Sequence, residues 1–346
     1  MIPHRDLHRF PLHALFPDNF TITYLPCAQI DITLRLQETG KMPIPQETAT
    51  SSSCGVGKTG KMPIPQETAT SSSCGVGVSP ALSTETPALS TETGKMPITQ
   101  ETREIPSLLS FEHPTSKGFS QLEFSQLESE VICQLFPNPN RISSQHATKA
   151  AVETALCQKH SIFHFTGHGT YNFHNPVLSY LALADEDKLT LADICKIDLS
   201  NYRLVTLAAG ETAITGDRTI TAEYVGLVSG FINSGVAHVV STLWTVESAA
   251  SALVTIQFYQ RLRRGKPPVI ALAEATQWLG NVTNAELADF YAATEIAIPH
   301  NEVSLRRLVA RLRDKINKQE PSIKPYKSPY FWSAFTIAGN LPNETN

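Results

Sequence analysis

An internal repeat divides the chain into parts of different kinds. Residues 39–57 read TGKMPIPQETATSSSCGVG, and the same 19 residues recur at 59–77, a period of 20. The unit PALSTET then occurs twice in 80–93, and a third, partial copy of the first unit covers 93–102. Each long copy holds two prolines and a Ser/Thr run, with too few apolar residues to offset the entropy of ordering the chain. The identical copies indicate recent duplication, and we expect a disordered surface insert rather than a solenoid.

The hydrophobic core must come from the rest of the sequence. Residues 25–110 contain no Phe, Tyr or Trp, so all 27 aromatic residues of the 346-residue chain lie outside this stretch. A body of that size can bury a single large core. We therefore predict one domain with an interruption: residues 1–37 form its N-terminal part, 38–105 the low-complexity repeat insert, and 106–346 the remainder.

Charge and cysteine usage exclude several classes of protein. The formal net charge is −4 without a concentrated Lys/Arg face, which argues against a nucleic-acid binder. No signal peptide is visible, and six cysteines without a CxxC pair are typical of free thiols in a reducing cytoplasm. Residues 224–246 lack charge and could span a membrane, but the Ser234-Gly235 break favours a helix, a turn and a strand. We expect a cytoplasmic protein that binds neither nucleic acid nor membrane.

Apolar strands alternate with amphipathic helices after the insert. This alternation implies an α/β fold with a mainly parallel sheet that is covered by helices on both faces. In such sheets the working site lies beyond the carboxyl ends of the strands. The predicted strands are 161–166, 204–208 and 236–243, and the predicted helices are 121–135, 147–157, 219–233, 247–264, 267–279 and 302–318.

Two of these strand ends carry candidate functional residues. The first runs into Gly167-His168-Gly169, where the glycines let the backbone turn sharply and leave the imidazole at the sheet edge. The second runs into residues 208–212, AAGET. Caspases place a histidine about 50 residues before a cysteine on the next strand end, and position 210 follows His168 at a similar interval. A histidine that only ties down a turn is the alternative interpretation.

Five segments carry motifs in a fixed order. Residues 160–175 read HSIFHFTGHGTYNFHN, 204–212 read LVTLAAGET, and 239–244 read VVSTLW. Near the two ends, residues 6–15 are similar to an LHxLPFxAL element and residues 329–335 to a closing PYYWAxF. This combination resembles the CHAT domains, the bacterial caspase-like domains often found beside tetratricopeptide repeats. The resemblance implies a caspase-like three-layer fold, protein or peptide substrates, and a tetratricopeptide-repeat partner.

The chemistry implied by the resemblance is that of a thiol peptidase. A cysteine at position 210 would attack the peptide carbonyl, and His168 would be the general base. Backbone N–H groups of Gly169 and of position 210 would hold the oxyanion. In this chain the nucleophile position is Gly210, which has no side chain to attack with. The residues expected to support the site are Gly167, Glu211 and Thr212.

Other nucleophiles are weaker candidates. Cys157 and Cys195 precede the two strands, so they should lie roughly 15–20 Å from the general base at about 3.3 Å per strand residue. Cys133 lies on an earlier helix, Cys27 lies near the insert, and Thr212 is better suited to fixing the turn. Loss of a catalytic nucleophile costs on the order of 10⁶ in kcat. We therefore predict no useful peptidase activity.

Neither a metal nor another cofactor is expected. A helix would place His160, His164 and His168 on one face as zinc ligands, with His174 nearby. The neighbouring residues favour a strand, in which His160 and His168 would lie about 26 Å apart. Residues 57–59, GKT, resemble the end of a phosphate-binding loop, but that loop needs a glycine at position 52 and a buried strand before it.

The sequence thus predicts a non-catalytic CHAT-domain homologue with a peptide-binding cleft near His168. Family members have a strand before the LHxLPFxAL element, so we also expect either a truncated domain that lacks its first strand or a first strand encoded in an upstream reading frame. Two alternatives stay open. The chain is an active thiol endopeptidase if Gly210 is a sequence error or is compensated by a partner. It is a scaffold or interaction domain if the cleft binds nothing.

Overall fold

The computed structural model describes the chain after the insert almost completely. Its described residues are 11–16, 22–24, 106–112, 116–119, 122–170, 172, 175–208 and 223–339. The predicted insert 38–105 lies outside them, and so do Gly210, Glu211 and Thr212.

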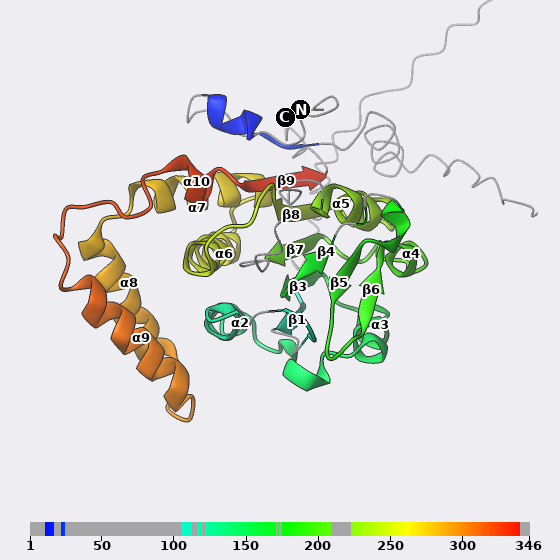
Figure 1. The fold of residues 1–346 in the computed structure, drawn as a ribbon, viewed down its shortest axis with the longest axis horizontal. Coiled ribbons are helices and arrows are strands. Elements are labelled where there is room, and N and C mark those ends of the chain that lie inside the picture. The colour runs from blue at the N-terminus through cyan, green and yellow to red at the C-terminus, as the bar shows by residue number, and fades with distance from the viewer. Residues whose placement is uncertain are drawn as a thin grey trace, which may run out of the picture. The chain divides into compact units, whose positions relative to one another are not determined.

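A six-stranded sheet forms the centre of the described part (Figure 1), in the order β2-β1-β3-β7-β8-β9. Every neighbouring pair is parallel except β8 with β9. The predicted mainly parallel sheet is therefore confirmed. Its strands are β1 (Leu108–Glu112), β2 (Asn140–Ser143), β3 (Ile162–Thr166), β7 (Leu204–Ala208), β8 (His238–Thr242) and β9 (Phe335–Gly339).

Helices cover both faces of this sheet, as Figure 1 shows. Successive strand residues point to opposite faces, and both faces are apolar, which is why the central strands read as continuous apolar runs. In β3, Ile162 belongs to one core cluster, while Phe163 and Phe165 belong to the other. This is the three-layer α/β arrangement predicted from the sequence. One face packs against α2 (Ser125–Cys133), α6 (Ser248–Arg263) and α7 (Pro268–Asn281), and the other against α3 (Lys149–Leu156), α4 (Leu191–Ile194) and α5 (Glu223–Asn233).

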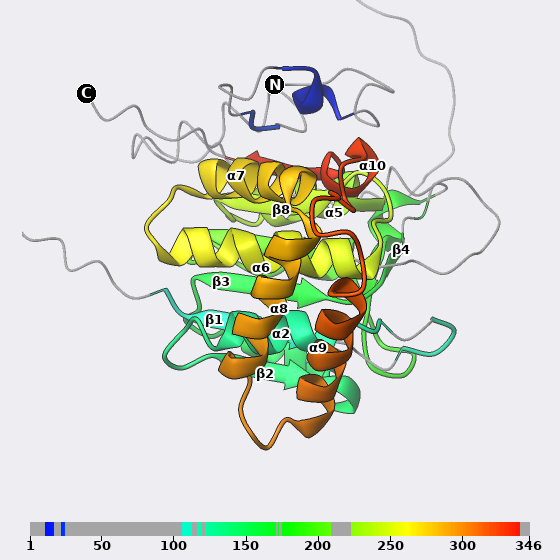
Figure 2. The same ribbon diagram turned by 90° about the vertical axis from the view of Figure 1, so that its left-hand side faces the viewer.

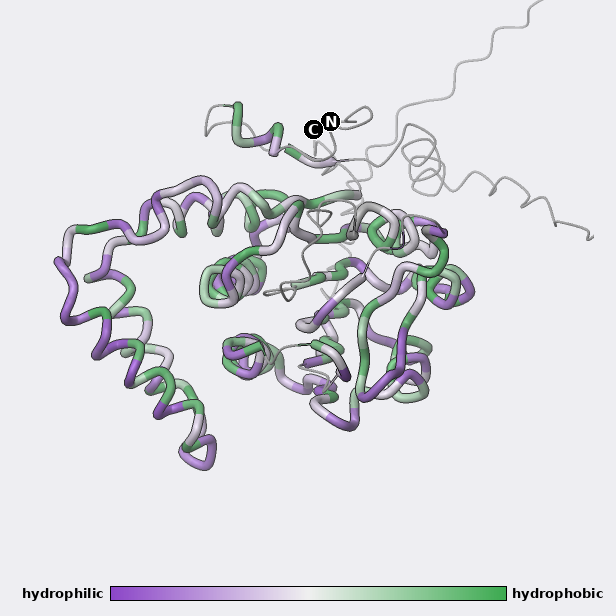
Figure 3. Tube along the Cα trace, viewed as in Figure 1, coloured by the Kyte–Doolittle hydropathy of each residue, from purple (hydrophilic) through white to green (hydrophobic). Residues whose placement is uncertain are grey.

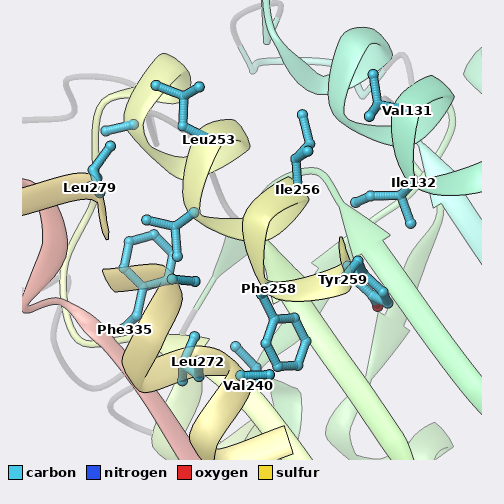
Figure 4. Packing of buried hydrophobic residues seen from close by; sticks show 14 of the residues in the cluster. Val131, Ile132, Val240, Leu253, Ile256, Phe258, Tyr259, Leu272, Leu279 and Phe335 are labelled. Carbon is cyan, nitrogen blue, oxygen red and sulfur yellow. The ribbon is translucent and has the colours of Figure 1, made fainter. Parts of the chain in front are cut away.

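Figure 4 shows part of the cluster on the α6 side. Phe258 and Tyr259 of α6 are completely buried, and they lie near Val240 of β8 and Ile132 of α2. Burying one large apolar side chain contributes about 1.5–3 kcal/mol. Figure 2 shows α6 and α7 running alongside the strands that they cover.

A small antiparallel sheet follows the carboxyl end of β3. It consists of β4 (Gly169–Thr170), β5 (Tyr180–Ala182) and β6 (Lys188–Thr190). Thr190 and Asp193 then form a capping box that starts α4, in which each side chain accepts a hydrogen bond from the backbone of the other residue. The segment after β3 is thereby held by its own ladder.

The C-terminal part adds helices and the last strand. The helices α8 and α9 pack against each other through Leu287, Tyr291, Leu305 and Val309, and purple and green alternate along α9 in Figure 3. Sequence analysis predicted α9 but not α8, β1, β2 or β9. The helices of this part are α8 (Asn284–Ala297), α9 (Val303–Ile316) and α10 (Pro329–Trp332). Short 3-10 helices among the described residues are η2 (Leu12–Leu15), η3 (Ser144–His146) and η4 (Pro176–Leu178).

The uncharged stretch 224–246 folds as predicted into a helix, a turn and a strand. It contains most of α5, the Ser234-Gly235 turn and β8. Among the described residues, none of the helices has the length and apolar character needed to cross a bilayer.

The N-terminal residues reach the outer edge of the main sheet. The Tyr24 N–H donates to the Ile337 carbonyl at 2.8 Å, and Tyr24 pairs with Ala338 of β9 in a parallel bridge. This contact occupies part of the edge beside β9.

Candidate active site

The pairing of β3 with β7 places the two candidate strand ends side by side. The strands are parallel and in register, with Thr166 opposite Ala208. The Gly167 N–H donates to the Ala208 carbonyl at 3.2 Å, so the pairing continues beyond β3. His168 and Gly210 each follow the matched pair by two residues. The register thus brings the ends of β3 and β7 together beside His168. Gly210 lies outside the described residues.

The backbone of His168 is fixed on both sides. Before it, Gly167 is bonded to β7; after it, the His168 carbonyl accepts a hydrogen bond from the Ala182 N–H at 2.8 Å. Because hydrogen-bonded and non-hydrogen-bonded pairs alternate in an antiparallel ladder, the next pair, Gly169 with Leu181, is a non-hydrogen-bonded one. The Gly169 N–H therefore points away from β5.

The imidazole of His168 is covered. His168 is only 2% exposed. The ring stacks on Phe119, with 4.7 Å between the ring centroids and an angle of 21° between the planes. Sequence analysis expected a free imidazole at the sheet edge and did not identify Phe119, which is 49 positions away in the chain. The expectation of an uncovered ring is wrong, because the loop after β1 folds over the end of β3.

Several buried polar side chains contact one another beside β3 and β7, on the α6 side of the sheet. His164 Nε2 is 3.3 Å from Glu128 Oε1, and both residues are almost fully buried. The Tyr259 ring meets His164 edge-on at 5.4 Å, and its hydroxyl donates to Thr206 Oγ1 at 3.0 Å. Burial raises the pKa of Tyr259 far above its usual range, so the phenol stays a neutral donor. Sequence analysis considered His164 only as a metal ligand and missed its partners.

The cysteines with described positions do not supply an evident nucleophile. Cys133 lies on α2 and is 6% exposed, and burial raises the pKa of its thiol, which disfavours the reactive thiolate. Cys157 and Cys195 are exposed and directly follow α3 and α4, before β3 and β7 begin. The topology therefore places them toward the amino ends of these strands, as predicted, whereas His168 follows a carboxyl end.

The histidine-rich segment folds as a strand. His164 lies inside β3, His160 precedes it and His168 follows it, in agreement with the strand prediction. His174 lies outside the described residues. In the described ranges, no three His, Cys, Asp or Glu residues are grouped so that they could hold a metal ion.

Comparisons with known proteins give one match over nearly the whole chain. The family model of the CHAT domain matches residues 2–340. A comparison with curated proteins found no match.

Among solved structures, the chain is similar to the Arg-specific cysteine proteinase gingipain R, with 10% identity and a TM-score of 0.35 over 68% of this chain and 46% of that chain. It is also similar to a complex of the pro- and mature domains of RgpB from Porphyromonas gingivalis, with 9% identity and a TM-score of 0.37 over 68% and 47%. The chain spans just under half the length of these solved chains. Because the family model matches far more than half of the chain, the chain belongs to the CHAT domain family.

Proposed function

We propose that the chain is a caspase-like cysteine-peptidase homologue that binds a peptide or protein segment near His168 without hydrolysing it. The observation that supports the proposal is the register of β3 with β7, because His168 and position 210 each come two residues after the matched pair of Thr166 and Ala208 in the sequence. That position is glycine. A base without a nucleophile can polarise a bound group, but it cannot form an acyl-enzyme.

The groups that remain suit binding. The Gly169 N–H points away from β5 and can donate to a peptide carbonyl, which is the role predicted for it as an oxyanion donor. This donor and His168 are held in fixed relative positions, because Gly169 belongs to β4 and the backbone on either side of the His168 side chain is bonded to β7 and β5. Such preorganised groups retain affinity for a carbonyl after the covalent step is lost.

The test compares four proteins on a fluorogenic peptide library: the unmodified chain, His168→Ala, Gly210→Cys, and Gly210→Cys with His168→Ala. We expect no turnover from the unmodified chain. In Gly210→Cys, the Cys sulfur would form a bond to the peptide carbonyl carbon, and His168 would pass the thiol proton to the departing amine. Activity in the unmodified chain that disappears in His168→Ala would overturn the proposal and favour the active thiol endopeptidase.

Peptide binding needs its own measurement. Isothermal titration of the unmodified chain with library peptides is expected to give binding that weakens in His168→Ala. If no peptide binds to either protein, the scaffold interpretation replaces the cleft, and a tetratricopeptide-repeat protein becomes the partner to test. Re-sequencing codon 210 is the matching control, because one base separates a glycine codon from a cysteine codon.

A further inference from the structure

We propose that Phe119 closes this site, and that a ligand reaches His168 only after the turn that carries Phe119 moves aside. This inference names the regulation of the site and rests on the proposed function only for the identity of its ligand. We call residues 116–119 the closing turn.

The ring contact leaves no room for a substrate group on one face of the imidazole. Two rings that stack at 4.7 Å between centroids are in van der Waals contact, so no third group fits between them. His168 is 2% exposed as a whole. A general base must lie within hydrogen-bond reach of the proton that it takes. A buried ring against Phe119 does not meet that condition for a ligand that arrives from solvent.

The closing turn is anchored on the β5–β6 connection. The Ser116 hydroxyl donates to the Leu183 carbonyl at 2.6 Å, and the Lys117 N–H donates to the Asp185 carbonyl at 2.8 Å. The Lys117 ammonium also lies 2.6 Å from a Glu186 carboxylate oxygen, but both side chains are more than 70% exposed. That exposed pair adds little. The two hydrogen bonds of Ser116 and Lys117 tie the turn to the β5–β6 connection.

Gly118 gives the turn its shape. The Phe119 N–H donates to the Ser116 carbonyl at 3.3 Å, which closes a four-residue turn with Gly118 at its third position. Gly118 has φ +87°, a left-handed conformation that side chains disfavour and that type II turns require there. An added Cβ at Gly118 would meet no atom within 4 Å. The conformation of Gly118, rather than its packing, therefore aims Phe119 at His168.

The closing turn is suited to opening because little is buried in it. Lys117 and Gly118 are exposed, and Ser116 and Phe119 are half-buried. By contrast, every residue of β1 and β3 is buried. Segments with few buried contacts open at much lower free energy than the core does. Opening would free the face of the His168 ring that stacks on Phe119, and it needs no change in the main sheet.

The experiment measures the reaction of diethyl pyrocarbonate with each histidine at pH 7, by mass spectrometry and without any peptide ligand. The exposed His300 and the fully buried His164 serve as internal references. Trypsin releases His160 to Lys188 as one peptide, so fragmentation must assign the modified histidine within it. In Phe119→Ala we expect the rate at His168, relative to His300, to rise roughly threefold to tenfold, the effect of losing one ring-stacking contact.

Gly118→Ala is the second variant, since it keeps the phenyl ring and disfavours only the turn. It is expected to raise the rate at His168 in the same way. Its matched control is Gly265→Ala at the end of α6, where φ is +85° and an added Cβ again meets no atom within 4 Å. Phe119→Tyr keeps the stacked ring and is expected to behave like the unmodified chain.

Unchanged modification of His168 in both Phe119→Ala and Gly118→Ala would overturn the proposal. If Phe119→Ala also raises the rate at His164, the variant has lost its fold, and Gly118→Ala alone decides. Because no peptide is present, the result does not depend on whether the site binds one. Failure of the binding test and failure of the closing turn are therefore separate outcomes.

Discussion

At the scale of single residues, His164 and Glu128 form a contact between two polar side chains that are both almost fully buried. The two groups lie 3.3 Å apart in the centre of the molecule, between β3 and α2, and almost no water reaches them. Burying two polar groups costs free energy, and their contact with each other offsets part of that cost. The pair therefore couples the strand that ends at His168 to the helix that covers it.

Removing either partner alone should destabilise the fold. We expect Glu128→Leu or His164→Leu to lower the free energy of unfolding by about 1–3 kcal/mol, because the remaining polar group stays buried without its neighbour. The double variant should lose much less than the sum of the two. Urea unfolding of all four proteins measures this coupling.

An exposed pair provides the control for this cycle. Lys266 lies 2.8 Å from Glu274, and both side chains are more than a third exposed. Lys266→Ala should change the free energy of unfolding by less than about 1 kcal/mol. Additive losses in the His164 and Glu128 cycle would contradict the coupling that we infer.

At the scale of elements, sequence reasoning found the strands that are buried on both faces. Ile162–Thr166 and Leu204–Ala208 are apolar runs that end at small residues, and a fully buried parallel strand has that pattern. It missed β2, Asn140–Ser143, which lies at the edge of the sheet, is only half-buried and carries polar residues. An edge strand is defined by its neighbour, and no periodicity in the sequence records that neighbour.

Part of the candidate site could also be predicted from the sequence. The glycines around His168 and the spacing to Gly210 are local or family patterns, and they identified the strand ends. The contact of Phe119 with His168 depends on where the loop after β1 folds, and that loop is anchored on the distant Leu183 and Asp185. Such a contact leaves no local pattern in the sequence.

The N-terminal element η2 should make stability depend on pH. The Tyr24 hydroxyl accepts a hydrogen bond from the backbone N–H of His13 at 3.0 Å, and its oxygen lies 2.9 Å from His13 Nδ1, within hydrogen-bond distance. Burial lowers the pKa of His13 from 6.5 to about 4. The unfolded chain therefore binds a proton that the folded chain excludes, and stability falls as the pH drops from about 6.5 to about 4.

Thermal unfolding across this pH range tests the contribution of His13. In His13→Gln the loss of stability between pH 7 and pH 4 should be smaller than in the unmodified chain, because Gln takes up no proton. His300→Gln, at an exposed position, should follow the unmodified chain. Equal pH profiles for all three proteins would mean that η2 is not bound to the sheet edge through His13.

At the scale of the whole molecule, both core clusters join segments that lie far apart in the chain. The cluster on the α6 side joins Leu108 to Phe335, and the cluster on the other side joins Tyr24 to Ala338. The contact of Tyr24 with β9 closes a long connection, because the predicted insert separates Tyr24 from β1. The entropy of closing that connection opposes folding.

Deleting residues 38–105 should therefore stabilise the fold. The connection from Tyr24 to Leu108 shortens from about 80 residues to about 15, which is worth on the order of 1–2 kcal/mol in loop-closure entropy. Urea unfolding of the deletion variant measures the gain, and limited proteolysis of the unmodified chain should cut first within 38–105. Deleting 284–316 is the contrasting control. It removes Leu287, Tyr291, Leu305 and Val309 from the core and should prevent cooperative unfolding. A loss of stability on deleting 38–105 would show that the repeats belong to the folded domain, contrary to their composition.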